Sequence, residues 1–200
     1  MSWIRTIGYD ASGGILRRLY DRLRGPGGSI DEIMRLHSLR PHTLSAHMAL
    51  YKSVLHHAAN EVPAWLVELL GVHVSRLNGC GYCVEHHYAG LRRVLGDDER
   101  AEALRAAARD GEFGRVLEPR EAAALDYAER LTLDPAGMDE ARVRDLREAG
   151  WTDAEILEIN QVVSYFAYAN RTALGLGASA AGEVLGLAPR SEDPDDWTHV

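Results

Sequence analysis

Signals for the start and end of helices recur along this chain, and they constrain its fold more than any other feature of the sequence. Ser29–Glu32 and Thr152–Glu155 match the capping box, in which a hydroxyl and a carboxylate bond to backbone N–H groups that the first helical turn leaves free. No stretch alternates apolar and polar residues between hairpin turns, as strands would. The sequence therefore predicts an all-α protein. The expected helices span about 30–38, 42–59, 63–77, 80–95, 98–109, 119–132, 138–148 and 153–175.

The two ends of the chain differ in composition from this helical body. Five glycines between positions 13 and 28 surround a short helical piece, which is typical of a mobile arm. The last residues are rich in Asp and Glu, and we expect Trp197 among them to dock on a neighbouring surface. The predicted division is an N-terminal arm (1–29), a single helical domain (30–187) that is long enough to bury a core, and an acidic tail (188–200).

The charge and hydropathy of the chain exclude several classes of protein. Its net charge is -8, whereas a nucleic-acid-binding protein needs a clustered basic surface that displaces counterions. No apolar run approaches the roughly 20 residues that span a bilayer. The first residues lack the basic segment and apolar core of a secretory signal. We therefore expect no nucleic acid and no membrane as partners, and a cytoplasmic location in which a lasting structural disulfide is not expected.

The chain has two cysteines, Cys80 and Cys83, which stand three positions apart. In a reducing compartment an isolated pair with this spacing indicates redox or metal chemistry. Asn78 and Gly79 end the preceding helix, so that the next helix begins at Cys80. The free N–H groups and partial positive charge at a helix N-terminus favour a thiolate over a thiol. We therefore interpret the pair as a reactive dithiol.

Two side chains near the cysteines suit proton transfer. His87 follows Cys83 by four positions, one turn along the same helical face, whereas His86 falls beside Tyr82 on a more polar face. Glu68 lies on an otherwise apolar face of the preceding helix, where burial without a partner would be costly. A histidine on the antiparallel neighbouring helix could be that partner. Desolvation would raise the pKa of the carboxyl group toward the range that serves acid–base catalysis.

Each of these residues also has a plainer interpretation. The cysteines can be small core residues, or they can bind zinc together with His73, His86 or His87. Glu68 alone can be a solvated surface residue, and His73 stands among leucines, which suits a core position. No partner spacing supports a role for the remaining histidines that precede the motif. These are His37, His42, His47, His56 and His57.

Glu68, followed after eleven residues by Cys80-Gly81-Tyr82-Cys83-Val84-Glu85-His86-His87, resembles the active-site signature of the AhpD-like alkylhydroperoxidases. This family lies within the carboxymuconolactone decarboxylase superfamily. The run from Asn78 to Cys83 is similar to that of its uncharacterised peroxidase-related branch, and so is the stretch 165–171. The resemblance covers about residues 45–180.

This resemblance implies an AhpD-like helical bundle and the reduction of organic hydroperoxides. It implies that Cys83 is the peroxidatic thiol, that Cys80 resolves it to a disulfide, and that Glu68 and His87 relay protons. A dithiol or lipoyl-bearing protein would restore the thiols, and no metal or organic cofactor is needed. The best-studied members carry a histidine between the cysteines, where this chain has Tyr82.

Two other functions and an assembly state belong to the same expectations. The chain can be a carboxymuconolactone decarboxylase-type enzyme, although such enzymes generally lack the cysteine pair, or a non-enzymatic thiol redox sensor, which needs the same accessible thiol. Apolar residues cover much of the expected helices 42–59 and 153–175. We therefore expect a symmetric homo-oligomer, and the family resemblance agrees.

Overall fold

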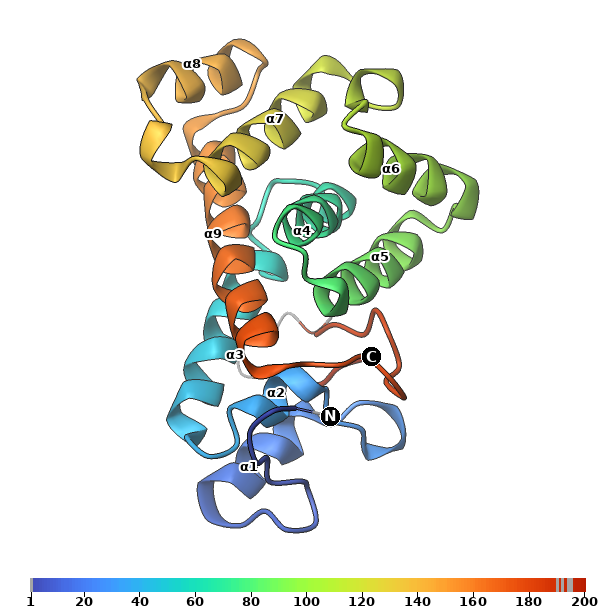
Figure 1. The fold of residues 1–200 in the computed structure, drawn as a ribbon, viewed down its shortest axis with the longest axis vertical. Helices are drawn as coiled ribbons and strands as arrows, with labels where there is room; N and C mark the ends of the chain where they lie inside the picture. Colours follow the sequence, from blue (N-terminus) through green and yellow to red (C-terminus); the bar gives the residue numbers. More distant parts are fainter. Residues whose placement is uncertain (1, 190, 192, 194–195) are drawn as a thin grey trace.

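The computed structural model describes residues 2–189, 191, 193 and 196–200, and this part of the chain is built from α-helices (Figure 1). Within those residues, β-pairing is limited to an isolated bridge between Pro189 and His199. The predicted all-α class is confirmed, and each expected helix is present. The helices are α1 (Gly14–Leu23), α2 (Glu32–Leu36), α3 (Pro41–Leu55), α4 (Ala64–Leu77), α5 (Gly81–Leu95), α6 (Asp98–Asp110), α7 (Pro119–Leu133), α8 (Glu140–Glu148) and α9 (Asp153–Leu176), with short 3-10 helices at Pro26–Gly28, Phe113–Arg115 and Pro135–Gly137.

Helix α4 lies at the centre of the molecule (Figure 1). Helix α5 returns beside it as the second arm of a hairpin, and α6, α7 and α9 pack against its other sides. Every residue of α4 from Leu66 to Ser75 is buried, as expected for a helix that is apolar around most of its circumference. The hydrophobic effect therefore holds the α4–α5 hairpin firmly in place.

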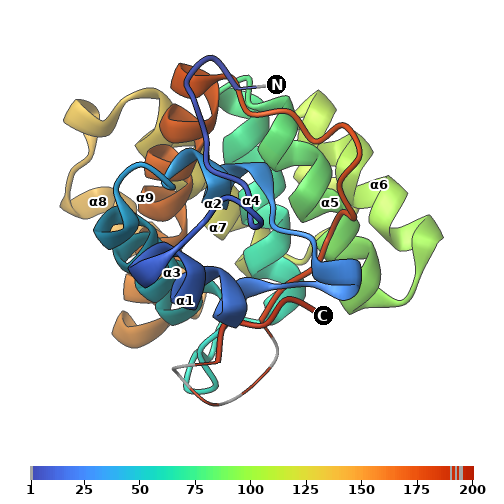
Figure 2. The same cartoon turned by 90° about the horizontal axis from the view of Figure 1, so that it is seen from below.

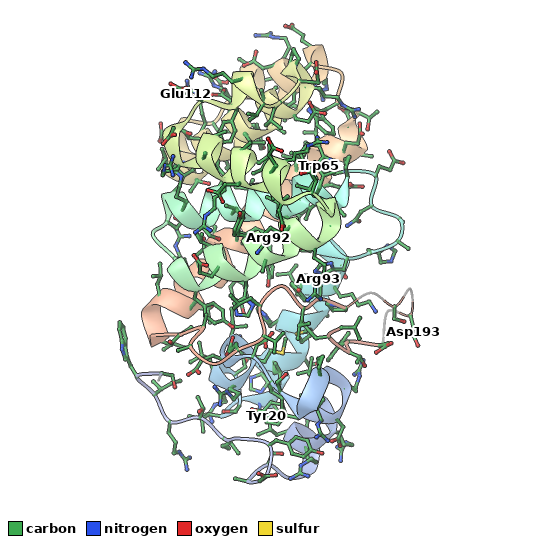
Figure 3. All side chains as sticks on the ribbon, turned by 90° about the vertical axis from the view of Figure 1, so that its right-hand side faces the viewer. Tyr20, Trp65, Arg92, Arg93, Glu112 and Asp193 are labelled. Atoms are coloured by element: carbon green, nitrogen blue, oxygen red, sulfur yellow. The ribbon has the colours of Figure 1, made fainter. Side chains whose placement is uncertain are left out.

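Helices α1, α2 and α3 form a second layer against one end of α9 (Figures 1 and 2). Tyr20, labelled in Figure 3, is fully buried in this layer, and its hydroxyl donates to the backbone oxygen of Ile7 at 2.8 Å. Leu16, Leu19 and Leu23 lie on the same face of α1 and are also buried. Four residues of the expected N-terminal arm thus belong to the hydrophobic core.

One of the two predicted capping boxes is found. Thr152 Oγ1 accepts from the backbone N–H of Glu155, whose carboxylate accepts from the N–H of Thr152 in return. The prediction at Ser29 is wrong, because α2 begins at Glu32 with Asp31 as its N-cap. The N–H of Glu32 donates instead to the carboxylate of Glu183, at 2.5 Å. A distant side chain has replaced the local cap.

The segment after α9 folds back over the molecule rather than leaving it (Figure 2). Trp197 is 4% exposed and the guanidinium of Arg22 lies 3.7 Å from the centre of its ring, so the expected docking of this tryptophan is confirmed. Arg93 on α5 donates to the backbone oxygen of Val200 at 2.9 Å. Figure 3 shows this segment crossing between the two layers, with Arg93 and Asp193 labelled near its course. Across the described residues, no helix combines the length and apolar character that a bilayer span requires.

Candidate active site

The two cysteines stand at the tight turn that joins α4 to α5. The N–H of Cys80 donates to the carbonyl oxygen of Ser75, and the N–H of Gly79 donates to that of Arg76. These two bonds, with Gly79 at a φ of 73°, form the Schellman motif that ends a helix. Cys80 is also the N-cap of α5. One turn therefore ends one helix and places both cysteines at the start of the next.

The dithiol is compact and buried. The sulfur atoms of Cys80 and Cys83 lie 3.0 Å apart, and the two residues are 1% and 3% exposed. The hydrogen bond between the sulfurs lowers the pKa of Cys80 to about 7 against the effect of burial, and the backbone N–H of Cys83 adds to this. The same contact and burial raise the pKa of Cys83 well above its ordinary value. The contact therefore favours a thiolate at Cys80 over one at Cys83 in the resting pair.

Helix α9 contributes a buried amide to the dithiol. Asn170 donates to Ser75 Oγ at 3.0 Å and accepts from the side chain of Asn78 at 2.9 Å. Hydrogen bonds with Asn170 and Ser75 oppose the rise in the pKa of Cys83. Asn170 is fully buried, so its orientation is fixed by these bonds. Helix α9 and the two arms of the α4–α5 hairpin therefore position the reactive sulfur together.

The predicted carboxylate–histidine pair is present. Glu68 on α4 bonds to His87 on α5, with 2.7 Å between Oε2 and Nδ1. Both side chains are largely buried, at 9% and 15% exposure. The ring of Phe166 on α9 meets that of His87 edge to face, with ring centres 4.5 Å apart. The imidazole is consequently held by a hydrogen bond on one side and by packing on another.

Two glycines make room for this arrangement, and the sequence reasoning missed both. A Cβ atom on Gly90 would stand 2.7 Å from Oε1 of Glu68, so only glycine lets the carboxylate lie against α5. A Cβ atom on Gly71 of α4 would stand 2.3 Å from the ring of Phe166. Either substitution would displace a group that holds His87. The spacing of Gly90, three residues after His87 on the same helical face, was the available signal.

A cavity of about 50 Å³ opens beside Cys83. Glu68 and His87 line it, and so does Tyr165 from α9. Cys80 is not among the described residues of its wall. A small molecule in this cavity would therefore meet the sulfur of Cys83 first.

A second carboxylate–histidine pair also reaches the cavity. His86 Nε2 lies 2.8 Å from a carboxylate oxygen of Glu183, to which the hydroxyl of Tyr82 donates at 3.2 Å. Burial raises the pKa of nearby Asp31 to about 6, although the proximity of His86 opposes the shift. His86 lies beside Tyr82 as expected, with ring centres 4.6 Å apart, and it also lines the cavity. Glu183 was missed, since it lies in a loop 97 positions away.

Aromatic side chains form another wall of the cavity. Three rings lie close together there, with centres 5.8–6.4 Å apart: those of His47 and Tyr51 from α3 and that of Tyr165 from α9. Burial lowers the pKa of His47 to about 3 and raises the pKa values of both tyrosines well above the ordinary value. These side chains are therefore neutral hydrogen-bonding groups near neutral pH. His199 from the C-terminal segment stacks on Tyr51 at 5.9 Å.

The remaining candidates lie away from this chemistry. His73 is fully buried on α4 with its ring edge-on to Phe113, which agrees with the core position preferred for it. In the part of the chain that the structure describes, no three His, Cys, Asp or Glu side chains are placed to hold a metal ion. That part includes His86 and His87, which the zinc interpretation named with the cysteines.

Comparison with known proteins gives the site its relatives. Residues 41–130 match the sequence model of the Carboxymuconolactone decarboxylase family. The uncharacterized protein YdfG of Bacillus subtilis (strain 168) is 33% identical over 121 residues, which are 58% of this chain and 76% of that protein. The match to the family model covers both cysteines and the helices α4 and α5.

Solved structures share the fold. An uncharacterized peroxidase-related protein from Silicibacter sp. TM1040 is 27% identical, with a TM-score of 0.67 over 76% of this chain and 78% of that one. Another, from Ralstonia eutropha JMP134 and described as an alkylhydroperoxidase AhpD core, has a TM-score of 0.76 over 95% and 97% of the chains at 23% identity. The debrominase Bmp8, in a cysteine-to-alanine variant with 2,3,4-tribromopyrrole, has a TM-score of 0.68 over 91% and 95% at 18% identity. The last two show likeness of fold alone.

Proposed function

Given that this chain belongs to the carboxymuconolactone decarboxylase family, we propose that it is a thiol-dependent peroxidase of the AhpD-like kind, which reduces organic hydroperoxides. One observation carries the proposal. The dithiol, with its sulfurs 3.0 Å apart, presents Cys83 to a cavity that also holds the Glu68–His87 pair. A nucleophile, a resolving thiol and a proton relay thereby share one small site.

The first chemical step consumes the peroxide. The thiolate of Cys80 takes the proton of Cys83 across the sulfur–sulfur contact, which leaves a thiolate at the cavity. This thiolate attacks the terminal oxygen of R–O–O–H, an S–O bond forms, and the O–O bond breaks. The departing alkoxide takes a proton relayed through His87 and leaves as an alcohol. The bond from Nδ1 to Glu68 fixes the tautomer, so that Nε2 remains for this exchange.

The second step closes the disulfide. Cys83 now carries a sulfenic acid, and the thiol of Cys80 attacks its sulfur, releasing water. An external dithiol, such as a lipoyl-bearing protein, then exchanges with the disulfide and restores both thiols. A cycle that ends on an external dithiol suits a reducing compartment, and the cytoplasm is the location we propose.

We also propose a homo-oligomer. Met48, Tyr51 and Leu55 on α3 are covered within the chain itself, so the case now rests on other residues. Leu157 on α9 is 61% exposed, and Leu50 on α3 is 40% exposed. Exposed apolar residues on long helices are a common basis for association. Light scattering that gave only a 22.1 kDa species at micromolar concentration would contradict this assembly.

Two alternative functions, a redox sensor and a decarboxylase, predict different results in an activity assay. A redox sensor would oxidise once with each peroxide pulse, whereas an enzyme consumes peroxide continuously while a dithiol is supplied. A decarboxylase would release carbon dioxide from a lactone acid without any need for the two thiols, which supports the peroxidase over it. Cumene hydroperoxide consumption with dithiothreitol or dihydrolipoamide, by the intact chain and by Cys83→Ser, distinguishes the three. Continuous consumption that the substitution abolishes supports the proposal, and equal rates in both proteins would refute it.

A further inference from the structure

The fixed charges around the cavity are acidic. The carboxylates of Asp31 and Glu68 line it, and that of Glu183 bonds to His86 and Tyr82 at its edge. None of the described residues in its wall is Lys or Arg. A negatively charged ligand would therefore enter a site with no fixed positive charge to receive it.

Cationic side chains on α2 and α3 are bonded to other groups. The buried ammonium of Lys52 donates to the backbone oxygens of Asp193 and Asp196. The guanidinium of Arg35 is paired with Glu32 at 2.6 Å. The imidazoles of His86 and His87 each bond to a glutamate, so a proton on either ring is balanced by a carboxylate. Lys52 and Arg35 are thus not part of the cavity wall, and neither histidine places an uncompensated positive charge there.

Neutral hydrogen-bonding groups face the same space. Nδ1 of His47 is buried and bonds to no other atom of the described residues. Tyr51 and Tyr165 line the same cavity, and both residues are more than nine-tenths buried. A buried polar atom without a partner is costly. A ligand that offers a neutral oxygen would satisfy Nδ1 of His47.

From this arrangement we infer that the cavity selects small neutral substrates and rejects anions, so that the substrate class is neutral alkyl hydroperoxides. Their oxygen atoms accept hydrogen bonds from Tyr51 and Tyr165 or bond to His47. The volume of about 50 Å³ fits a hydroperoxide group and a short carbon chain. The reaction named here rests on the proposed function, whereas the rejection of anions rests only on the wall of the cavity.

The rejection of anions is tested by alkylation, which needs no peroxidase activity. Iodoacetamide and iodoacetate have the same size and differ in charge, and mass spectrometry reports the modification of Cys83. The ratio of the iodoacetamide rate to the iodoacetate rate at Cys83 is divided by the same ratio measured for free dithiothreitol. This removes the intrinsic difference in reactivity between the two reagents. We expect iodoacetamide to react with Cys83 at least tenfold faster than iodoacetate on this scale. A ratio equal to that of dithiothreitol would overturn the inference, and so would no labelling by either reagent.

Two matched variants assign the effect to the cavity. Asp31→Asn removes one carboxylate from the wall, and asparagine keeps the N-cap of α2. Glu85→Gln removes one from an exposed site on α5 that pairs with Arg105. We expect Asp31→Asn to reduce the selectivity about threefold to tenfold, which is about 0.7–1.4 kcal/mol, and Glu85→Gln to leave it unchanged. Equal effects in both variants would show a property of the net charge and contradict the inference.

A matched pair of hydroperoxides extends the test to turnover. Methyl 3-hydroperoxy-3-methylbutanoate is neutral, and its free acid carries a carboxylate on the same skeleton. We expect the ester to be reduced at least tenfold faster by kcat/KM. Equal rates would overturn the selection of neutral substrates. Consumption of neither would refute the proposed peroxidase, while the alkylation ratio would still decide whether the cavity rejects anions.

Discussion

Two neighbouring histidines of α5 are held by glutamates from very different parts of the molecule. His87 bonds at 2.7 Å to Glu68, which stands 19 positions earlier on the other arm of the α4–α5 hairpin. His86 bonds at 2.8 Å to Glu183, 97 positions later in the C-terminal segment. Both carboxylates are 9% exposed. The same two residue types therefore have different roles in the two pairs. The Glu68–His87 pair lies beside the dithiol on a fixed hairpin, and the Glu183–His86 pair holds the returning C-terminal segment over the cavity.

The largest expected effect concerns the dithiol that the first pair serves. Among the described residues of the cavity wall, Cys83 carries the only thiol, and the other sulfur belongs to Met34. Turnover of hydroperoxide should therefore fall to background in Cys83→Ser. Cys80→Ser should allow one oxidation per chain and no sustained cycle, because no thiol remains to close the disulfide. Peroxide consumption with dithiothreitol, followed in both variants, checks this. Sustained turnover by Cys83→Ser would remove the basis for the whole comparison.

The next effect separates the two histidines. Glu68→Gln and His87→Asn should each lower kcat by roughly 10²–10⁴-fold, the usual range for acid–base catalysis, with the helical content unchanged. The control is His73→Asn, a buried histidine on α4 whose loss should cost far less activity. Steady-state kinetics with circular dichroism check both results. Wild-type rates in Glu68→Gln and His87→Asn together would refute the relay and leave only the dithiol.

A smaller effect is expected from the second pair. His86→Asn and Glu183→Gln should lower kcat less than about tenfold, which is below the range of acid–base catalysis. They should instead increase amide hydrogen exchange in residues 177–189, because the bonds from Glu183 to Tyr82, His86 and the N–H of Glu32 hold that segment. Hydrogen exchange with mass spectrometry provides the measurement. A loss of kcat as large as that in His87→Asn would make the two pairs equivalent.

The smallest effect is the pH dependence of the free energy of unfolding, which arises from buried histidines on the side of the second pair. Burial lowers the pKa of His47 to about 3 and that of His199 to about 4, below the unfolded value of about 6.5. The unfolded chain then binds more protons as pH falls below 6.5, so stability decreases toward pH 4. Asp31, with its pKa raised to about 6, acts in the opposite sense between pH 6 and 4 and offsets part of the loss.

The size of this effect is on the order of 1 kcal/mol per histidine between pH 7.5 and 5.5. His56 and His73, whose pKa values burial lowers to about 4, add to it. The urea midpoint at the two pH values provides the measurement. His47→Gln should make the dependence shallower, and a midpoint that rises toward pH 5.5 would contradict these buried neutral histidines.

The first pair could be predicted from the sequence because its parts are local. Gly79 ends one helix and Cys80 begins the next, which makes the helices antiparallel and brings Glu68 opposite the face that carries His87. The spacing of charged and apolar residues is then enough to bring the two together. The helical class was predictable on the same grounds, since caps and helix formers act within a few residues.

The second pair could not be predicted, because its partner comes from a loop without periodicity. Glu183 lies beyond α9, and its position depends on Gly186, where a Cβ atom would meet the backbone of Ala89 and Gly90 at 2.7–2.8 Å. Its carboxylate also accepts a hydrogen bond from the N–H of Glu32 at the start of α2. The expected capping box would have bonded this N–H to the hydroxyl of Ser29. A contact between residues 151 positions apart thus overrode a local signal, and the sequence offered no pattern for it.

The central claim is that Cys83 is the thiol that meets the peroxide. It is tested most directly by treating Cys80→Ser and Cys83→Ser with one equivalent of tert-butyl hydroperoxide and trapping sulfenic acid with dimedone. Mass spectrometry then locates the adduct. We predict an adduct on Cys83 in Cys80→Ser and none, or one formed at least a hundredfold more slowly, on Cys80 in Cys83→Ser. An adduct that formed faster on Cys80 would contradict it.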